Sequence, residues 1–449
     1  MNTVRRHQLR VRQDPRNGKL RGRKRLFRAP LAQTLKIAIL TRPHQEGANV
    51  GVRRIVRTSV LRACVTLPPP SLPNATTTAP SQTPALTLPS PPVSFPLGWL
   101  LDHAAAPIQY RAMVEVARLP APIPDQVATL PFTHRAALTL AVTQAPDGTW
   151  SHAMLSLPNN RAEHFEGIGT INAVRRLLEY GWDKDSPPLV HARRVLFRLL
   201  AEDEDADYLF ELRGKTGLDE DLARRGRGIL REAAAAALAQ AGYEGDPRLR
   251  GAARRVIERI AAYLRSPMAE KPFIRVGNQH VLPPEAAPPS IYALQMLAHM
   301  PLFRAEYHDA MALLYRHLSQ AMPRQEPVQV FGKKLISQPH LVLGDMLPNR
   351  NAADDDVVLA VYWLELMARL GFLRRNDNWC KLYDRFLDDR DELGVWHPHK
   401  GIHAVRSSNP FLWAAYPLEE SLSGEERWTD ITFRLGLIGR LIGRTIELV

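Results

Sequence analysis

The chain has 449 residues and a formal net charge of +13, and the excess charge lies at one end. Residues 1–62 contain 17 Lys or Arg against two acidic residues, whereas the rest of the chain has 42 basic and 44 acidic residues. The only cysteines are Cys64 and Cys380, which argues against a secreted fold held together by disulfide bonds. No run reaches about 18 apolar residues, which argues against a membrane span. We therefore expect a cytoplasmic protein.

The first 96 residues lack the pattern of a folded domain. Residues 63–96 are rich in Pro, Ser and Thr and contain no charged side chain, so they cannot bury enough apolar surface to offset chain entropy. We expect a disordered linker there. The basic tail, residues 1–62, is expected to be disordered as well, and a start codon assigned too early would also explain it. Nucleic acid is the less favoured partner of this tail, because Phe27 is its only aromatic residue for base stacking.

Residues 97–449 have the pattern of an all-α domain built from helix hairpins. The plainest helix begins at Asp246-Pro247, a capping residue followed by a first-turn proline, and its apolar side chains recur at steps of three and four up to Leu264. Strand-like alternation is confined to residues 273–276 and 329–335. Further helices are expected over residues 107–115, 134–144, 163–180, 188–201, 221–241, 290–299, 305–320, 353–370, 378–387 and 430–441.

Some of these helices are amphipathic, and others are apolar on most of their circumference. Between Val357 and Gly371 only Glu365 and Arg369 are charged, at positions i and i+4. A helix that is apolar nearly all round must be covered on most sides. A two-layer ring of inner and outer helices requires such a mixture, but an open solenoid contains it as well.

Two turns share one sequence pattern. Residues 144–150 read Gln-Ala-Pro-Asp-Gly-Thr-Trp, and residues 390–396 read Arg-Asp-Glu-Leu-Gly-Val-Trp, with Arg390 in place of the glutamine. The Gln-x-x-x-Gly-x-Trp spacing resembles the repeat of the terpenoid cyclase and protein prenyltransferase superfamily, which includes squalene cyclase-like domains. The resemblance implies that the helical hairpins close into an α/α toroid, in which the glutamine bonds helix-end carbonyls and the tryptophan stacks on the next unit. The alternative is an open HEAT-like α-solenoid.

Three adjacent carboxylates, Asp354 to Asp356, begin an apolar helix. Squalene-type cyclases protonate an alkene with an Asp-x-Asp-Asp motif at a similar helix start, and the resemblance implies that Asp354 and Asp355 are the catalytic acids. Ala353 stands where the motif has its first Asp, which counts against this role. The three carboxylates could instead cap the helix and interact with its dipole.

Four loops combine aromatic and polar residues, and one of them contains Trp396-His397-Pro398-His399. His-x-His could ligate a metal, line a ligand cleft or lie on an ordinary surface loop. The prenyltransferase zinc ligands cannot be matched here, so no metal site is assigned and no cofactor is identified. If alternate loops gather at one end of a ring, the residues lining the cavity would be Trp150, His152, His280, His340, Asp345, Trp396, His397 and His399.

We therefore expect a prenyltransferase- or squalene cyclase-like protein whose central cavity binds an apolar or isoprenoid-like small molecule, with retention of catalysis left open. The alternative function is a solenoid scaffold that binds another protein along a concave face. A closed ring requires contact between the first and last helices, whereas a solenoid keeps them apart.

Overall fold

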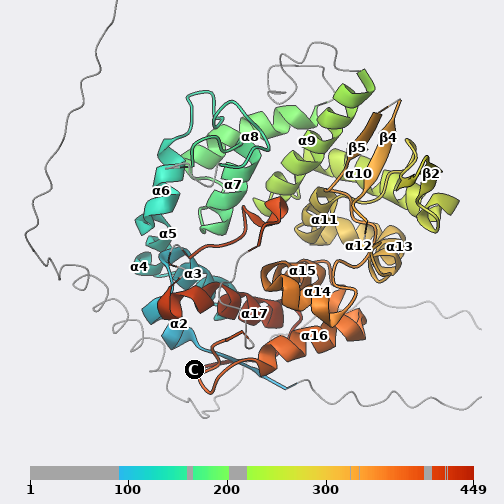
Figure 1. Cartoon of the computed structure of the whole chain (residues 1–449). Helices are drawn as coiled ribbons and strands as arrows, with labels where there is room; N and C mark the ends of the chain where they lie inside the picture. The colour runs from blue at the N-terminus through green and yellow to red at the C-terminus, as the bar shows by residue number, and fades with distance from the viewer. Residues whose placement is uncertain are drawn as a thin grey trace, which may run out of the picture. The chain divides into compact units, whose positions relative to one another are not determined.

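The computed structural model describes residues 91–158, 165–201, 220–323, 325–332, 334–398, 407–419, 421 and 423–449. These residues are mostly helical, as expected, with a few short strands (Figure 1). The strands are β1 (Val93–Phe95), β2 (Ile274–Val276), β3 (Gln279–Val281), β4 (Val328–Phe331), β5 (Lys334–Ser337) and β6 (Ile446–Leu448). The helices are α2 (Leu97–His103), α3 (Ala106–Arg111), the π-helix η1 (Ala112–Val116), α4 (Asp125–Ala128), α5 (Leu130–Thr133), α6 (Arg135–Val142), α7 (Thr170–Glu179), α8 (Pro187–Leu200), α9 (Glu220–Gln240), α10 (Pro247–Arg265), α11 (Ile291–Ala298), α12 (Pro301–Glu306), α13 (His308–Leu318), α14 (Arg350–Asp355), α15 (Val357–Arg369), α16 (Asp377–Asp388) and α17 (Thr429–Leu441).

Residues 90–449 form one compact unit. It begins ahead of the expected boundary at Leu97, because β1 precedes that residue and pairs with β6. Residues 1–90 of the tail and linker lie outside the described residues, so their predicted disorder stays a prediction; the end of the linker expected over 63–96 is ordered, since Val93–Phe95 form β1. Within the described part of the chain, no helix combines the length and apolar character needed to cross a membrane.

Three helix predictions need correction. The helix expected over 305–320 is divided at Tyr307 into the end of α12 and α13. The helix expected over 163–180 begins at Thr170, because the backbone at Gly169 is extended. A Cβ on Gly169 would lie 2.5 Å from the Met154 backbone, which supports close packing as the reason for this glycine. The helix expected over 353–370 is divided into α14 and α15 at Asp356, whose backbone is not helical and whose side chain caps α15.

The helices form an inner and an outer set. Helices α7, α9, α11, α15 and α17 contact one another in chain order, and α17 then contacts η1. Most residues of α7, α11, α15 and α17 are buried, and so is the second half of α9, where the run from Glu232 to Ala239 is enclosed; residues 223–229, in the first half of α9, are half-buried or exposed. In Figure 1, α6, α8, α10, α13 and α16 lie outside them. The helices that are enclosed on most sides therefore form the inner set, and the amphipathic helices form the outer set.

The first and last elements of the unit are in contact. Strands β1 and β6 pair in parallel, with Val93 opposite Ile446, and α17 packs against α2, α3 and η1. Gly436 allows this approach, because a Cβ there would clash with the ring of Phe95. The red α17 lies beside the blue α2 and α3 in Figure 1.

The two turns with the shared sequence pattern also share their hydrogen bonds. In both, the glycine (Gly148, Gly394) has a positive φ and the amide of the following tryptophan donates to a threonine hydroxyl of the next inner helix at 3.1 Å. Gln144 donates to the carbonyl of Pro188, at the start of the next outer helix, at 2.8 Å. Arg390 donates instead to the carbonyl of Ser94 in β1, at 2.5 Å. The arginine thus performs the bridging role of the glutamine between the end of the unit and its beginning.

At the centre, six charged side chains from α3, η1, α7, α15 and α17 form a closed cycle of alternating charge, which we call the charge ring. Its links are Arg111–Glu179 (2.5 Å), Glu179–Arg434 (3.5 Å), Arg434–Glu365 (2.6 Å), Glu365–Arg369 (2.9 Å), Arg369–Glu115 (3.9 Å) and Glu115–Arg111 (2.5 Å). Most of these groups are nearly fully buried, so each depends on its neighbours to offset desolvation. Burial alone would raise the pKa of Glu365, but the guanidinium groups of Arg434, Arg369 and Arg111 lower it to about 2.

We expect Glu365→Gln to destabilise the unit by about 3–5 kcal/mol, because it removes the counter-charge that Arg434 and Arg369 share in the interior. The free energy of unfolding from urea titration at pH 7 is the measurement. Glu306→Gln is the matched control, since it breaks a pair with Arg250 that is largely exposed, and it should cost less than about 1 kcal/mol.

The same variant has an expected pH dependence. A carboxyl group with a lowered pKa stabilises the fold fully above its unfolded value of 4.5, and this contribution is lost as the pH falls toward 2. The difference in unfolding free energy between wild type and Glu365→Gln should therefore shrink below pH 4.5. A difference that stays constant from about pH 6 to about pH 3 would contradict the role of the ionised carboxylate.

Candidate functional site

The predicted site residues in the two shared turns do not form one site: the tryptophans are core residues, and the histidines contact carboxylates of their own turns. Trp150 and Trp396 are each 1% exposed and pack as core residues, and the Trp150 indole donates to the Leu140 carbonyl. His152 is exposed, with its Nδ1 4.0 Å from a carboxylate oxygen of Asp147. His397 forms a hydrogen bond with the Asp391 carboxylate in the other turn, and His399 lies outside the described residues.

The three helix-start carboxylates do not share one environment. Asp354 and Asp355 are exposed on α14, and Asp354 forms a 2.7 Å ion pair with Arg385. Asp356 caps α15 and accepts a hydrogen bond from Ser407. An acid that protonates an alkene requires an apolar enclosure to stay protonated. The exposed side chain of Asp355 does not meet this requirement.

Asp345 is buried within the fold. Its two carboxylate oxygens accept hydrogen bonds from the indole nitrogens of Trp363 (3.0 Å) and Trp379 (2.9 Å), and the Leu347 amide donates to it as well. Burial raises the pKa of Asp345, and these three hydrogen bonds oppose that rise. The carboxylate therefore joins α15 to α16 through two tryptophans, a role that no local sequence pattern indicates.

One of the predicted site residues, His340, lines a pocket of about 310 Å³, which we call the Glu232 pocket. Its walls come from the first half of α9, from Arg259 of α10, and from the connection that leads into α11. The lining residues are Arg224, Arg225, Gly228, Ile229, Glu232, Arg259, Pro284, Glu285, Ala286, Ala287, Pro288, Ser290, Gln329, Gln338, His340 and Leu341. A pocket of this size with several converging polar groups is suited to a small ligand.

Glu232 is the buried acidic group of this pocket. It is 7% exposed, and its two oxygens accept hydrogen bonds from Arg259 and from the hydroxyl of Ser290, both at 2.5 Å. Ser290 also caps α11 by accepting from the Ala293 amide, so its hydroxyl proton is directed to Glu232. Ser290 therefore donates a hydrogen bond that stabilises the Glu232 carboxylate, and this arrangement of its hydroxyl does not suit nucleophilic attack.

The opposite wall is held by backbone contacts. Gln329, from β4, donates to the carbonyls of Pro283 (2.9 Å) and Ala286 (2.8 Å) in the proline-rich connection. Its side-chain oxygen accepts from Arg225, whose guanidinium lies 3.9 Å from the centre of the Phe331 ring. These contacts fix the shape of the pocket through several separate segments of the chain.

Two polar side chains in the pocket have unused hydrogen-bonding capacity. Among the described residues, neither the imidazole of His340 nor the side-chain amide of Gln338 has a hydrogen-bond partner. Burial lowers the pKa of His340, so the imidazole is neutral at pH 7 and can both donate and accept. In this pocket, His340 and Gln338 therefore each provide a hydrogen-bond donor and an acceptor, and the buried carboxylate of Glu232 lines the same pocket.

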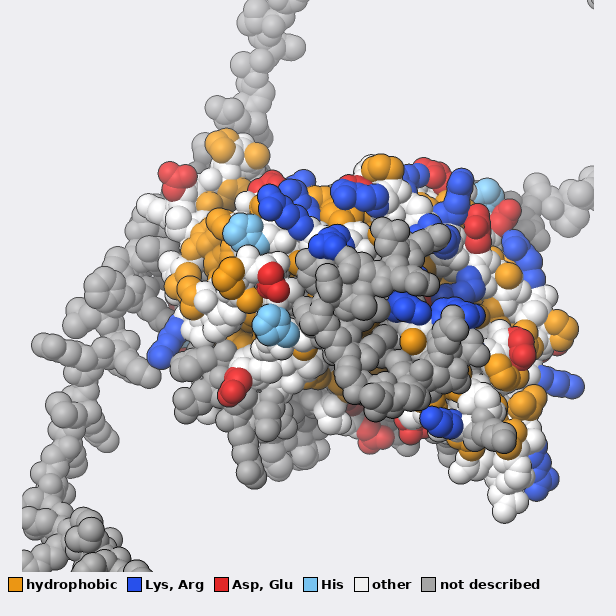
Figure 2. All heavy atoms as spheres, turned by 90° about the horizontal axis from the view of Figure 1, so that it is seen from above, with side chains coloured by type: hydrophobic (Ala, Val, Ile, Leu, Met, Phe, Trp, Pro, Cys, Tyr) orange, Lys and Arg blue, Asp and Glu red, His pale blue; other side chains and the backbone are white. Residues whose placement is uncertain are grey.

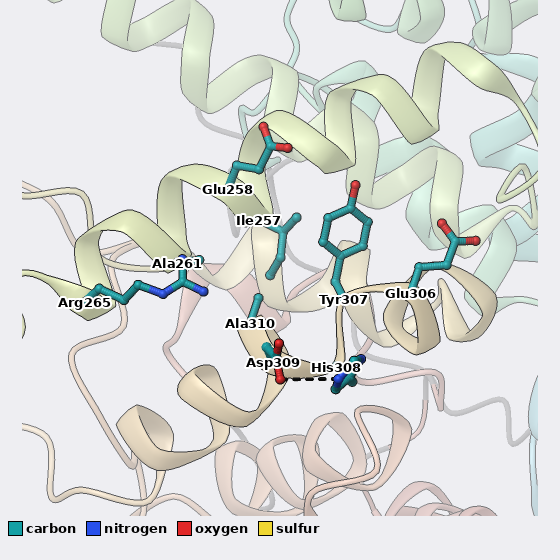
Figure 3. Close-up of a pocket in the computed structure, with 9 residues that line it drawn as sticks. All are labelled: Ile257, Glu258, Ala261, Arg265, Glu306, Tyr307, His308, Asp309 and Ala310. Atoms are coloured by element: carbon teal, nitrogen blue, oxygen red, sulfur yellow. Dashed lines mark ion pairs between the residues drawn. The ribbon is translucent and has the colours of Figure 1, made fainter.

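A second depression, also of about 310 Å³, lies between α10 and the segment from Glu306 to Ala310. Figure 3 shows the ion pair there between His308 and Asp309, two side chains that are at least 80% exposed. Because the charged groups of this depression face water, it holds a ligand less well than the Glu232 pocket. In the described part of the chain, no group of three or more His, Cys, Asp or Glu could hold a metal ion.

The remaining predicted residue, His280, lies on the exposed hairpin formed by β2 and β3, opposite Arg275. Figure 2 shows basic and acidic side chains interspersed with hydrophobic ones on the face seen from above. Sequence reasoning missed Glu232, Ser290 and Gln338. A serine before a helix is a signal for a cap, but no signal in the sequence connects that cap to a carboxylate in another helix.

Replacing Asp345 with asparagine should destabilise the fold by about 1–3 kcal/mol, because the amide nitrogen of the new side chain would face one of the two indole N–H donors. Unfolding in urea, followed by tryptophan fluorescence, measures this cost; the signal comes from all eight tryptophans of the chain, of which Trp363 and Trp379 are two. Asp309→Asn, at a position with a highly exposed side chain, is the control and should be nearly neutral. Equal stability of wild type and Asp345→Asn would show that the indole contacts do not depend on the carboxylate.

Comparison of the chain with protein-family models, with curated proteins and with solved structures found no match.

Proposed function

We propose that residues 90–449 form an α/α toroid that binds a small hydroxylated molecule in the Glu232 pocket. The observation that carries the ligand proposal is the pair of polar groups, His340 and Gln338, that have no partner among the described residues and lie next to the buried carboxylate of Glu232. Hydroxyl groups of a ligand would donate to the imidazole or the carboxylate and accept from the amide. The volume of about 310 Å³ restricts the ligand to a small molecule.

Three observations support the toroid. The inner helices contact one another in chain order, α17 packs against η1, and β1 pairs with β6. The Arg390–Ser94 hydrogen bond repeats, across the two ends of the unit, the link that Gln144 makes between neighbouring hairpins. An open solenoid, the alternative architecture, has no reason to bring its two ends together in this way.

The apolar or isoprenoid-like ligand implied by the family resemblance is not the ligand that we favour. The charge ring occupies the point where η1, α7, α15 and α17 meet, and an apolar ligand there would have to face six charged side chains. The Glu232 pocket contains Glu232, Arg259, Gln338 and His340, whose polar groups an isoprenoid chain would leave without hydrogen-bond partners. The second candidate function, a solenoid scaffold that binds another protein, applies only if the helices do not close into a toroid.

A cysteine pair tests the toroid. Ser94 and Glu447 are register partners in the β1–β6 pair, so Ser94→Cys with Glu447→Cys should form an intramolecular disulfide under mild oxidation. Because the closed loop contains nearly the whole unit, the disulfide should stabilise it by about 4 kcal/mol or more. Peptide mass mapping with and without reductant detects the cross-link, and each single variant serves as a control. Formation of only intermolecular disulfides would favour the open solenoid.

Ligand-observed NMR tests the pocket, with glucose as the hydroxylated probe and farnesol as the isoprenoid probe. We expect saturation transfer to glucose in the wild type and its loss in His340→Phe, which fills the pocket and removes the imidazole. His280→Phe, on an exposed hairpin, should leave the glucose signal unchanged. Transfer to farnesol but not to glucose would contradict the proposal and favour the ligand implied by the resemblance.

A further inference from the structure

Arg175 is a buried cation that forms no ion pair with any carboxylate of the described residues. It lies on α7, one turn before Glu179 of the charge ring, and is 4% exposed. Glu179 is already engaged, since it accepts from Arg111 and Arg434 through one oxygen and from Gln240 through the other. A guanidinium in this position has lost its hydration and gained no ion pair, which is costly.

Three neutral polar groups from other inner helices or their ends lie around Arg175, while the carboxylates of Glu179 and Glu365 act on His299 and Tyr362 without forming an ion pair with Arg175. Its Nε donates to the side-chain oxygen of Gln240 in α9 at 3.1 Å, and its guanidinium interacts with the hydroxyl of Tyr362 in α15. His299, at the end of α11, is also near, and burial, followed by the charges of Arg369 and Arg175, lowers its pKa to about 4. None of these three polar groups supplies a negative charge at pH 7.

A second buried group in the same cluster has an unused acceptor. Gln295 of α11 is 2% exposed, and its side-chain nitrogen donates to the Tyr362 hydroxyl at 2.5 Å. Its side-chain oxygen has no hydrogen-bond partner among the described residues. Buried amide oxygens are rarely left without a donor. The Tyr362 hydroxyl thus contacts a cation that lacks a counter-charge and also the amide nitrogen of Gln295, whose oxygen lacks a donor.

We propose that the cluster of Arg175, Gln295 and Tyr362 is a binding site for a small oxyanion that also carries a hydroxyl group, such as hydrogen phosphate. The anion supplies the missing counter-charge to Arg175, and its hydroxyl donates to the free oxygen of Gln295. Burial raises the pKa of Tyr362, which keeps the phenol protonated as a donor at neutral pH. The site is separate from the Glu232 pocket, with which it shares no lining residue, and so it does not depend on the proposed function.

Inorganic phosphate and sulfate are the probes, because at pH 7 phosphate carries a hydroxyl and sulfate does not. Isothermal titration of the full chain in low-chloride buffer should show phosphate binding that is at least about tenfold tighter than sulfate binding. Arg175→Met should weaken phosphate binding at least about tenfold, since charge-assisted hydrogen bonds are lost. Gln295→Leu should remove the preference for phosphate over sulfate.

Three controls make the result specific to this site. Arg194→Met removes an exposed arginine of α8, and Glu232→Gln alters the other pocket; both should retain the wild-type affinity for phosphate within about twofold. In phosphate-free buffer, Arg175→Met should melt at a temperature no lower than wild type, because it removes an uncompensated buried charge. Phosphate binding that survives in Arg175→Met, or wild type that binds neither anion, would overturn the proposal; equal affinity for the two anions would overturn the role of the hydroxyl.

Discussion

The charge ring is the interaction on which the arrangement of the inner helices depends. Its three arginines and three glutamates alternate, so every group has an opposite charge on each side, and the ring as a whole is neutral. In a buried network each member is costly without its partners, and so a shift of one helix would expose the others to that cost. The directional hydrogen bonds of this network add to the close apolar packing between η1, α7, α15 and α17.

The shared turns at the periphery and the polar side chains of the inner helices add further contacts to those of the charge ring. The shared turns hold neighbouring parts of the unit together at the periphery, through Gln144 in one place and Arg390 in the other. The inner helices then carry their polar side chains to two places: the Glu232 pocket near the start of α11, and the Arg175 cluster beside the charge ring. The charge ring therefore helps to fix the Arg175 cluster, because Arg175 and Glu179 are one turn apart on α7.

The sequence predicted the features that depend on residues close together along the chain. Most helix positions, the strand β2 and the two shared turns follow from local periodicity and turn chemistry. The strand expected over 329–335 is instead the hairpin of β4 and β5, which turns at Gly332, and β3 was not expected. The charge ring was not predictable, because Arg111 and Arg434 come together only through the fold; Glu365 and Arg369 were recognised as a pair along one helix and nothing more. Among the expected site residues, only His340 lines a pocket that we describe, since nothing in the alanine-rich helix around Glu232 signals a ligand site.

The parallel pairing of β1 with β6 has a consequence for biosynthesis. The first strand of the unit cannot find its partner until residues Ile446–Leu448 have been synthesised and have emerged from the ribosome. Until then α2 and α3 lack the surface of α17 that covers them, and their buried face is exposed. Pairings between such distant segments form late and slowly. The nascent unit therefore depends most on protection from aggregation at its earliest-made end.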